Sequence, residues 1–188
     1  MVFQAPVLFE WRDIAGNVEL PLEILGRPAA ERTSRAKEML DLVDLGGFAG
    51  HSPSQLSGGM QQRVAIARAL VLEPSLLLMD EPFGALDEMT RERMNMELHR
   101  IWERTGTTVV FVTHSIPEAV FLSTHVVVMS ARPGSIIETI DIDLPRGRDV
   151  DTRESARYFE LVTQVRESLR GEESGRQSSA RAAAEGLA

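Results

Sequence analysis

The chain has 188 residues, of which 43% are hydrophobic and 26% are charged, values that are ordinary for a globular domain with a core. Its formal net charge of −8 argues against a nucleic-acid binder, and the absence of cysteine excludes disulfides and thiolate metal sites. The longest apolar runs have the length of strands and fall short of the roughly 20 residues that cross a bilayer.

The first seventy residues are predicted to hold a strand end, a loop and two helices. Residues 2–11 have the character of a strand end that runs into a loop stiffened by Pro6. Apolar residues recur at spacings of three and four over residues 31–45, which predicts an amphipathic helix that ends at two glycines. A second helical pattern covers residues 56–70 and stops before Pro74.

Strands and helices alternate along the next seventy residues. The short apolar runs at 75–79 and 107–113 are typical of strands that are buried on both faces. A helix with one apolar face is predicted between them at 88–105, and a short helix is predicted at 117–123. Residues 125–142 have the pattern of a hairpin. This order of elements predicts an α/β fold built on a parallel sheet.

The character of the sequence changes after Pro145. A charged linker leads into an amphipathic helix over residues 154–170, whose apolar side carries Phe159, Val162, Val165 and Leu169. Residues 171–188 are small and polar and are predicted to be disordered. We therefore expect one domain over residues 1–145, a linker and helix over 146–170, and a disordered tail.

Polar side chains suited to phosphate chemistry follow both predicted buried strands. Asp80 and Glu81 come directly after the first strand, where α/β sheets bind ligands. Asp80 would hold Mg²⁺ through its water shell and Glu81 would polarise a water for attack on a γ-phosphate, or the pair is simply an acidic turn. His114 follows the second strand, as a site residue or a capping residue. Gln4 is open to the same choice between a site and a solvated side chain, while Asp87 has the position of an N-cap.

The helix over 56–70 begins with a serine and two glycines. Backbone N–H groups at a helix start form an anion site, to which Ser57 adds a hydroxyl. Gly58 and Gly59 carry no side chain that would keep a phosphate away. The alternative is a serine-capped helix with flexible glycines. Because glycine at these positions costs on the order of 1 kcal/mol relative to alanine, a compensating role is expected.

Five of these features, in chain order, resemble the nucleotide-binding subunits of ABC transporters. They are Gln4, "LSGG" with Gln62 and Arg63 behind it, "LLLMDEP", "GALD" and "VTHS". They are similar to the Q-loop, the signature motif, the Walker B strand with its catalytic glutamate, the D-loop and the switch histidine. The resemblance covers about residues 2–140, and five ordered motifs make a chance match improbable.

A narrower resemblance rests on the flanks of these motifs. Met60 stands where the commonest signature has glutamine. Together with "MDEPFGALD" and "VVVMSARPG", it is similar to the importers for nitrate, sulfonate, taurine and related small solutes.

The resemblance implies a P-loop NTPase-like parallel sheet with a helical signature subdomain at about residues 12–73. It implies that Glu81 and His114 are catalytic and that Asp80 and Gln4 serve Mg²⁺. The nucleotide-contacting set would be Gln4, Ser57, Gly58, Gly59, Asp80 and Asp87. In this family two subunits pack head to tail, so the serine and glycines would grip the γ-phosphate of an ATP bound mainly to the partner.

The same resemblance implies the assembly. ATP hydrolysis would drive translocation of a small solute through transmembrane permease subunits, with a solute-binding protein taking part indirectly and no nucleic acid. The chain would work as a homodimer, peripheral to the cytoplasmic side of the cell membrane, with ATP and Mg²⁺ as cofactors.

One motif of the family is missing from the printed sequence. It contains no G-x-x-x-x-G-K-[ST], and its one lysine, Lys37, lies within a helical pattern with no glycine nearby. The first strands of the fold would be missing as well. We therefore expect a fragment or a mis-started gene that is inactive alone, or else a short chain without independent ATPase activity.

Two other classes of function stay open at this stage. ABC-type ATPases also serve DNA repair and translation, although the acidic charge favours a transporter. A purely regulatory module would use residues 154–170 to bind a partner, whereas in an ordinary domain this helix packs on its own chain.

Overall fold

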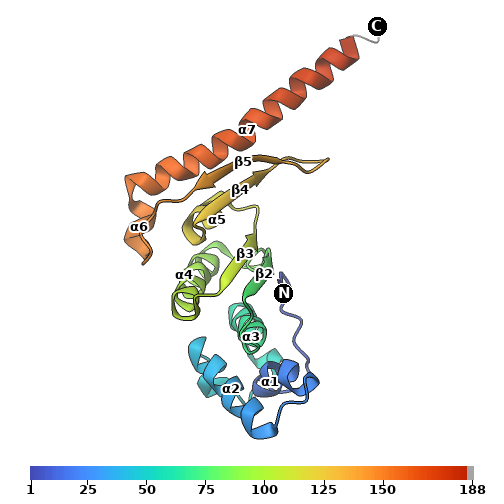
Figure 1. Cartoon of the computed structure of the whole chain (residues 1–188), viewed down its shortest axis with the longest axis vertical. Coiled ribbons are helices and arrows are strands. Elements are labelled where there is room, and N and C mark those ends of the chain that lie inside the picture. The colour runs from blue at the N-terminus through green and yellow to red at the C-terminus, as the bar shows by residue number, and fades with distance from the viewer. Residues whose placement is uncertain (186–188) are drawn as a thin grey trace. The chain divides into compact units, whose positions relative to one another are not determined.

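The computed structural model describes the backbone of residues 1–185 and the side chains of residues 1–170. The chain divides into two compact units, residues 1–114 and 115–188. Unit 1 holds β1 (Val2–Phe3), α1 (Ile14–Ile24), α2 (Ala29–Leu42), α3 (Gly58–Leu70), β2 (Leu76–Asp80), α4 (Glu88–Thr105) and β3 (Thr108–Val112) (Figure 1). Unit 2 holds α5 (Ile116–Leu122), β4 (His125–Met129), β5 (Ile136–Asp141), α6 (Val150–Glu154) and α7 (Ala156–Glu185).

The sheet of unit 1 is parallel, with strand order β1–β2–β3. Phe3 pairs with Asp80, and Asp80 pairs on its other side with Val112. The three strands therefore end at nearly the same level, and the residues that follow them emerge at one edge. The predicted α/β fold with a parallel sheet is confirmed.

Burial of β2 and β3 differs from the prediction. Leu77 and Met79 are buried, but Leu76 and Leu78 are 49% and 41% exposed. The same side of β3 exposes Val110. Successive side chains of a strand point to opposite faces, so a continuous apolar run does not tell whether both faces are covered. Among the described residues, only one face of the β2 and β3 pair is covered.

Three helices form a bundle in unit 1. α1, α2 and α3 pack against one another, and they occupy the stretch predicted to be a helical subdomain at about residues 12–73. Helix α2 begins and ends a few residues before the predicted 31–45, and its predicted apolar side is buried: Ala36, Met39, Leu40 and Val43.

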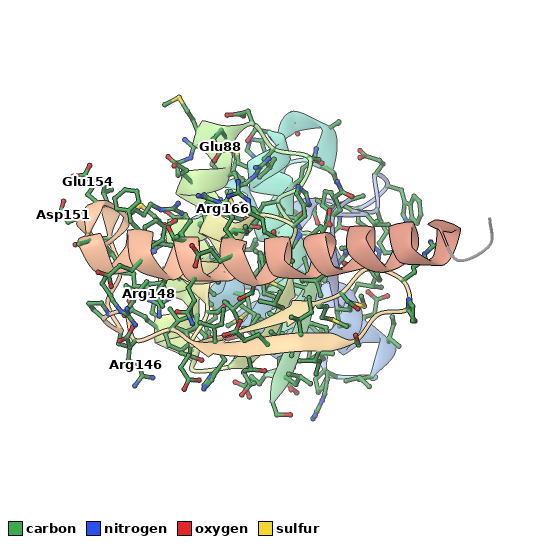
Figure 2. The ribbon with its side chains drawn as sticks, turned by 90° about the horizontal axis from the view of Figure 1, so that it is seen from above. Glu88, Arg146, Arg148, Asp151, Glu154 and Arg166 are labelled. Atoms are coloured by element: carbon green, nitrogen blue, oxygen red, sulfur yellow. The ribbon has the colours of Figure 1, made fainter. Side chains whose placement is uncertain are left out.

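Unit 2 is built around the antiparallel β4–β5 hairpin, on which α7 packs. Helix α5 also contacts α7. The boundary between the two compact units falls after His114, within the range 1–145 that was predicted to be one domain. Arg146, Arg148, Asp151 and Glu154 lie at the N-terminal end of α7 (Figure 2).

Helix α7 departs from its prediction in two respects. Its buried side consists of Tyr158, Leu161, Val162 and Val165, whereas Phe159 is exposed. Its backbone stays helical to Glu185, although disorder was predicted from residue 171. Residues 186–188 of the predicted tail lie outside the described residues.

Candidate functional site

The carboxyl edge of the unit 1 sheet gathers four of the predicted site residues. Gln4 follows β1, Asp80 ends β2, Glu81 follows it, and His114 lies two residues beyond β3. Because β2 lies between β1 and β3, these side chains come from adjacent strand ends. Asp80, His114 and Gln4 are exposed, and Glu81 is partly buried, so the cluster is open to solvent.

Glu81 and His114 are in direct contact. The Nδ1 atom of His114 lies 3.1 Å from Oε1 of Glu81. In this contact the imidazole N–H donates, because an ionised carboxylate can only accept. The backbone of Glu81 has φ of +43°, an uncommon value for a residue with a side chain, and its N–H donates to the carbonyl of Val112 at 2.9 Å. The tight turn after β2 thus aims Glu81 at the end of β3.

Gly84 lies between the side chains of Gln4 and Glu81. A Cβ atom at Gly84 would lie 3.0 Å from Nε2 of Gln4 and 3.4 Å from Oε2 of Glu81. The backbone N–H of Gly84 donates to the carbonyl of Glu81 at 3.0 Å. A glycine is therefore required for the amide and the carboxylate to approach the same point.

Arg91 braces the loop that follows Glu81, a role that sequence reasoning missed. Its guanidinium reaches from α4 to the carbonyls of Phe83 at 3.4 Å and Leu86 at 2.9 Å, and to the carboxylate of Glu88 at 3.0 Å. The loop between β2 and α4 thereby gains partners for backbone groups that no strand or helix satisfies.

A second cluster lies where α3 and α4 begin. The hydroxyl of Ser57 accepts from the N–H of Met60 at 3.4 Å, so Ser57 caps α3. A Cβ atom at Gly58 would lie 3.6 Å from the side chain of Leu86, and one at Gly59 would lie 3.4 Å from that of Thr90. Ser57 and Gly58 are exposed, whereas Gly59 is buried against α4.

Asp87 caps α4, as its position in the sequence predicts. Its carboxylate accepts from the N–H of Thr90 at 3.0 Å. Hydrogen bonds from the side chain and then from the backbone of Thr90 hold the pKa of Asp87 below its ordinary value. Asp87 therefore stays ionised at the N-terminal end of a helix, where negative charge is favoured.

Asp80 and Gln4, the predicted magnesium ligands, would hold Mg²⁺ only together with further oxygen ligands. Asp80 offers a carboxylate and Gln4 an amide oxygen, both from exposed positions at adjacent strand ends. Among the described residues, no three acidic, histidine or cysteine side chains form a metal-binding group. Mg²⁺ commonly takes one or two protein oxygens and completes its shell with phosphates and waters, so the two residues fit that kind of site.

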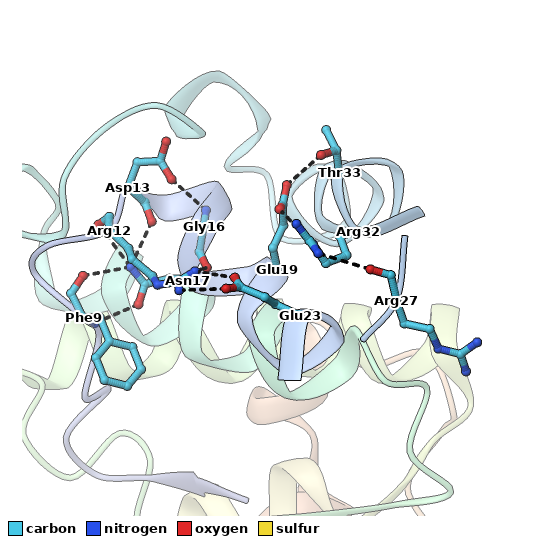
Figure 3. A network of polar contacts seen from close by, with 10 residues as sticks. All are labelled: Phe9, Arg12, Asp13, Gly16, Asn17, Glu19, Glu23, Arg27, Arg32 and Thr33. Atoms are coloured by element: carbon cyan, nitrogen blue, oxygen red, sulfur yellow. Dashed lines mark hydrogen bonds and ion pairs between the residues drawn. The ribbon is translucent and has the colours of Figure 1, made fainter. Parts of the chain in front are cut away.

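Residues 4–12, called the arm from here on, link the sheet edge to α1. Asn17 on α1 is fully buried and holds the far end of the arm (Figure 3). Its Oδ1 accepts from the N–H of Phe9 at 2.8 Å, and its Nδ2 lies within donating distance of the carbonyls of Phe9, Arg12 and Asp13 at 2.9 to 3.2 Å.

An ion pair and an aromatic pair complete the arm. Arg12 donates to Glu23 at 2.7 Å, and this hydrogen bond lowers the pKa of Glu23. The rings of Phe9 and Trp11 lie 4.8 Å apart, and Trp11 is 78% exposed.

Comparisons with known proteins converge on one family. The family described as "ABC transporter" matches residues 1–84. The chain is 47% identical to the taurine import ATP-binding protein of Rhizobium johnstonii over 92% of this chain and 68% of that protein. It is 49% identical to an uncharacterized ABC transporter ATP-binding protein of Methanocaldococcus jannaschii over 88% of this chain and 62% of that protein.

Solved structures give the same result. A dimeric ATP-binding cassette in a post-hydrolysis state, bound to ADP and Pi, aligns with a TM-score of 0.61 at 41% identity, over 75% of this chain and 61% of that one. A protein from Clostridium perfringens that is part of an ABC transporter complex aligns with a TM-score of 0.68 at 29% identity, over 74% of this chain and 55% of that one.

The match is long but not complete. The chain spans 62 to 68% of the first two relatives. No helix in the described part of the chain is both long and apolar enough to cross a membrane.

Proposed function

Since the chain belongs to the ABC transporter family of ATP-binding proteins, we propose that it is part of the ATP-hydrolysing subunit of an importer for a small solute of the nitrate, sulfonate or taurine type. The observation that carries the proposal is the contact between Glu81 and His114 beside Gln4, at the edge where three parallel strands end. The similarity to a taurine import protein supports the solute class.

The proposed chemistry assigns one task to each side chain at this edge. Glu81 accepts a proton from the attacking water, and His114 fixes the position of that carboxylate and of the γ-phosphate. Asp80 and Gln4 would hold Mg²⁺, which neutralises phosphate charge when it is bound. The phosphates would lie over the solvent-open edge between these side chains.

The second cluster would act on the nucleotide of a partner subunit. Ser57 and Gly58, at the start of α3, are exposed, as a surface that covers a phosphate from outside must be. Asp87, at the neighbouring helix start, would lie at the same subunit contact. The similarity to a dimeric cassette supports a dimer of this kind.

We further propose that the arm contacts a membrane permease, which would place the chain on the cytoplasmic side of the cell membrane. The exposed Trp11, whose ring lies beside that of Phe9, is the feature that favours such a contact. If Trp11→Ala lowers stability but leaves co-purification with a permease unchanged, the ring serves packing alone.

The first test uses the polypeptide of residues 1–188. It contains no G-x-x-x-x-G-K-[ST] phosphate cradle, so we expect negligible ATP hydrolysis. Mg²⁺-dependent turnover that disappears in Glu81→Gln would contradict this expectation.

The second test joins to Met1 an N-terminal segment that carries a G-x-x-x-x-G-K-[ST] phosphate cradle. In this chimera Glu81→Gln should slow single-turnover hydrolysis by about 10²–10⁴ and leave ATP binding intact, because a glutamine of similar shape replaces the base. Asp80→Asn should weaken ATP binding in Mg²⁺, and His114→Ala should slow hydrolysis with little loss of binding.

Glu103→Gln is the matched control for these variants. It changes an exposed carboxylate near the C-terminal end of α4, which has no proposed role in the site. Near-normal turnover of Glu81→Gln would remove Glu81 as the base and with it the proposed site.

A further inference from the structure

The arm lacks regular secondary structure, yet side chains of α3 hold two of its backbone carbonyls and the carbonyl just before it. Gln62 donates from Nε2 to the carbonyl of Phe3, just before the arm, at 3.0 Å. Arg68 donates from Nη2 to the carbonyl of Pro6 at 2.9 Å and from Nη1 to the carbonyl of Val7 at 3.0 Å. These bonds join residues about sixty positions apart and fasten the start of the arm to α3.

The environment of these two side chains shows that the bonds are built into the unit. Gln62 is 2% exposed. Burial lowers the pKa of Arg68, although an arginine stays charged, so its guanidinium needs acceptors that replace water. Two adjacent carbonyls provide them in the forked geometry that a guanidinium fits and an ammonium does not.

One of the two carbonyls that Arg68 binds belongs to a residue with an unfavourable backbone conformation. Val7 has φ of +41°, which is unfavourable for a β-branched side chain. Such a conformation persists where its surroundings determine it, and they often do so at functional sites. Arg68 binds the carbonyl of Val7 itself and that of Pro6, the residue before it.

We propose that Arg68 and Gln62 are positioning residues that lock Gln4 and the arm to α3. Helix α3 has 13 residues and is about 20 Å long, and the candidate phosphate site of Ser57 and Gly58 lies at its other end. A rigid helix that shifts when a phosphate binds at its N-terminus then carries the arm with it. This transmission rests on the function proposed above, whereas the lock itself does not.

The lock is tested in the polypeptide of residues 1–188 by amide hydrogen exchange. Two arm amides report on it: the N–H of Phe9, bound to Asn17, and the N–H of Arg12, bound to the carbonyl of Phe9. Arg68→Gln should speed their exchange about tenfold, and Arg68→Lys should have an intermediate effect because one ammonium cannot bind both carbonyls in the forked geometry.

Arg63→Gln is the matched control. Arg63 also reaches from α3 to a backbone carbonyl, that of Val43, at 3.0 Å, but does not touch the arm. Exchange in the arm should be unchanged in this variant. Equal acceleration in Arg63→Gln and Arg68→Gln, or none in either, would overturn the lock. If Arg68→Gln does not fold, Arg68→Lys decides, since it keeps the charge.

The transmission is tested in the chimera, with Glu81→Gln present so that ATP is not consumed. Adding ATP and Mg²⁺ should change arm exchange several-fold, and Arg68→Gln should abolish this change while ATP still binds. A change that persists in Arg68→Gln contradicts the transmission. A chimera that binds no ATP contradicts the proposed function and the transmission together, and the lock is then judged by the first measurement alone.

Discussion

Two arginines, one in each unit, use the same chemistry on different kinds of backbone. Arg68 in unit 1 and Arg148 in unit 2 both have a pKa lowered by burial. Each donates to the carbonyls of two consecutive residues, Arg68 to Pro6 and Val7, and Arg148 to Val120 and Phe121.

The difference lies in what those carbonyls belong to. Val120 and Phe121 are in the last turn of α5, where a helix runs out of N–H partners, so Arg148 completes an element that already exists. The carbonyls bound by Arg68 belong to the arm, which has no regular element to complete. Arg148 binds its two carbonyls from Nη1 alone and stabilises a helix end, whereas Arg68 binds its two from Nη1 and Nη2 and defines the conformation of a loop.

The largest loss of stability should follow from removing the guanidinium of Arg148 in unit 2. Arg148 is 9% exposed and also donates from Nε to the carbonyl of Pro145 at 3.0 Å. Arg148→Met leaves these buried carbonyls without that donor, at a cost of about 2–4 kcal/mol in the free energy of unfolding. Urea denaturation measures it, with Arg148→Lys as the partial rescue. If Arg148→Met lowers the free energy of unfolding by less than Arg68→Gln does, the proposed difference between the two arginines is wrong.

Asn17→Ala comes next, because it releases the other end of the arm. A fully buried amide loses all its bonds to Phe9, Arg12 and Asp13, and we expect a cost of about 2 kcal/mol. Denaturation gives the total, and exchange at the Phe9 amide shows that the loss starts in the arm. A variant as stable as the parent chain would show that water replaces these bonds without cost.

Arg68→Gln should cost only about 1 kcal/mol in global stability, since the carbonyls of Pro6 and Val7 lie closer to solvent and can turn to water. Its effect should be concentrated in local exchange of the arm. A global cost equal to that of Arg148→Met would mean that the arm is part of the core of unit 1 and not a loop held against it.

Tyr158→Phe probes a weaker tie within unit 2. The Tyr158 hydroxyl donates to the carbonyl of Pro117 at 3.0 Å and joins α7 to α5. Its loss should lower the free energy of unfolding by about 1 kcal/mol, because one partly buried hydrogen bond is removed and the ring stays. Gln164→Ala is the control on the exposed side of α7 and should have no measurable effect.

The smallest effect concerns the helix caps Asp87 and Asp149. The pKa of Asp149 is lowered first by the backbone N–H of Thr152, whereas that of Asp87 is lowered first by the side chain of Thr90. Their ionised forms therefore stabilise the fold above the unfolded pKa of about 3.9, and this contribution is lost as the pH falls through the lower folded pKa.

Carboxyl titration by NMR should give both aspartates midpoints below about 3.9. Thr90→Val should raise the midpoint of Asp87 more than Thr152→Val raises that of Asp149. Equal shifts would show that the hydroxyl matters to the same degree in both caps.

The cluster of side chains at the carboxyl edge of the unit 1 sheet could be predicted from the sequence, because parallel strands end at one edge. The positions of Gln4, Glu81 and His114 after three strands are enough to place them together, although their roles stay a proposal. The bonds made by Arg68 and Arg91 were not within reach. A side chain that binds a distant backbone carbonyl leaves no periodic pattern, and neither carbonyl is marked by its residue type.

The exposed faces of β2 and β3 show a second limit of prediction from the sequence. Leu78 and Val110 lie in runs as apolar as any core strand, yet they are exposed. An apolar strand sequence indicates that the strand can be buried, but it does not tell which element covers it.

The exposed Trp11 gives the arm an optical signal. The chain has two tryptophans, and the other, Trp102, is partly buried on α4 beside His99. A water-borne quencher such as iodide should therefore extinguish the fluorescence of Trp11 well before that of Trp102. In a Trp102→Phe background, emission reports on the arm alone, and a permease that covers Trp11 would shift it to the blue and shield it from iodide.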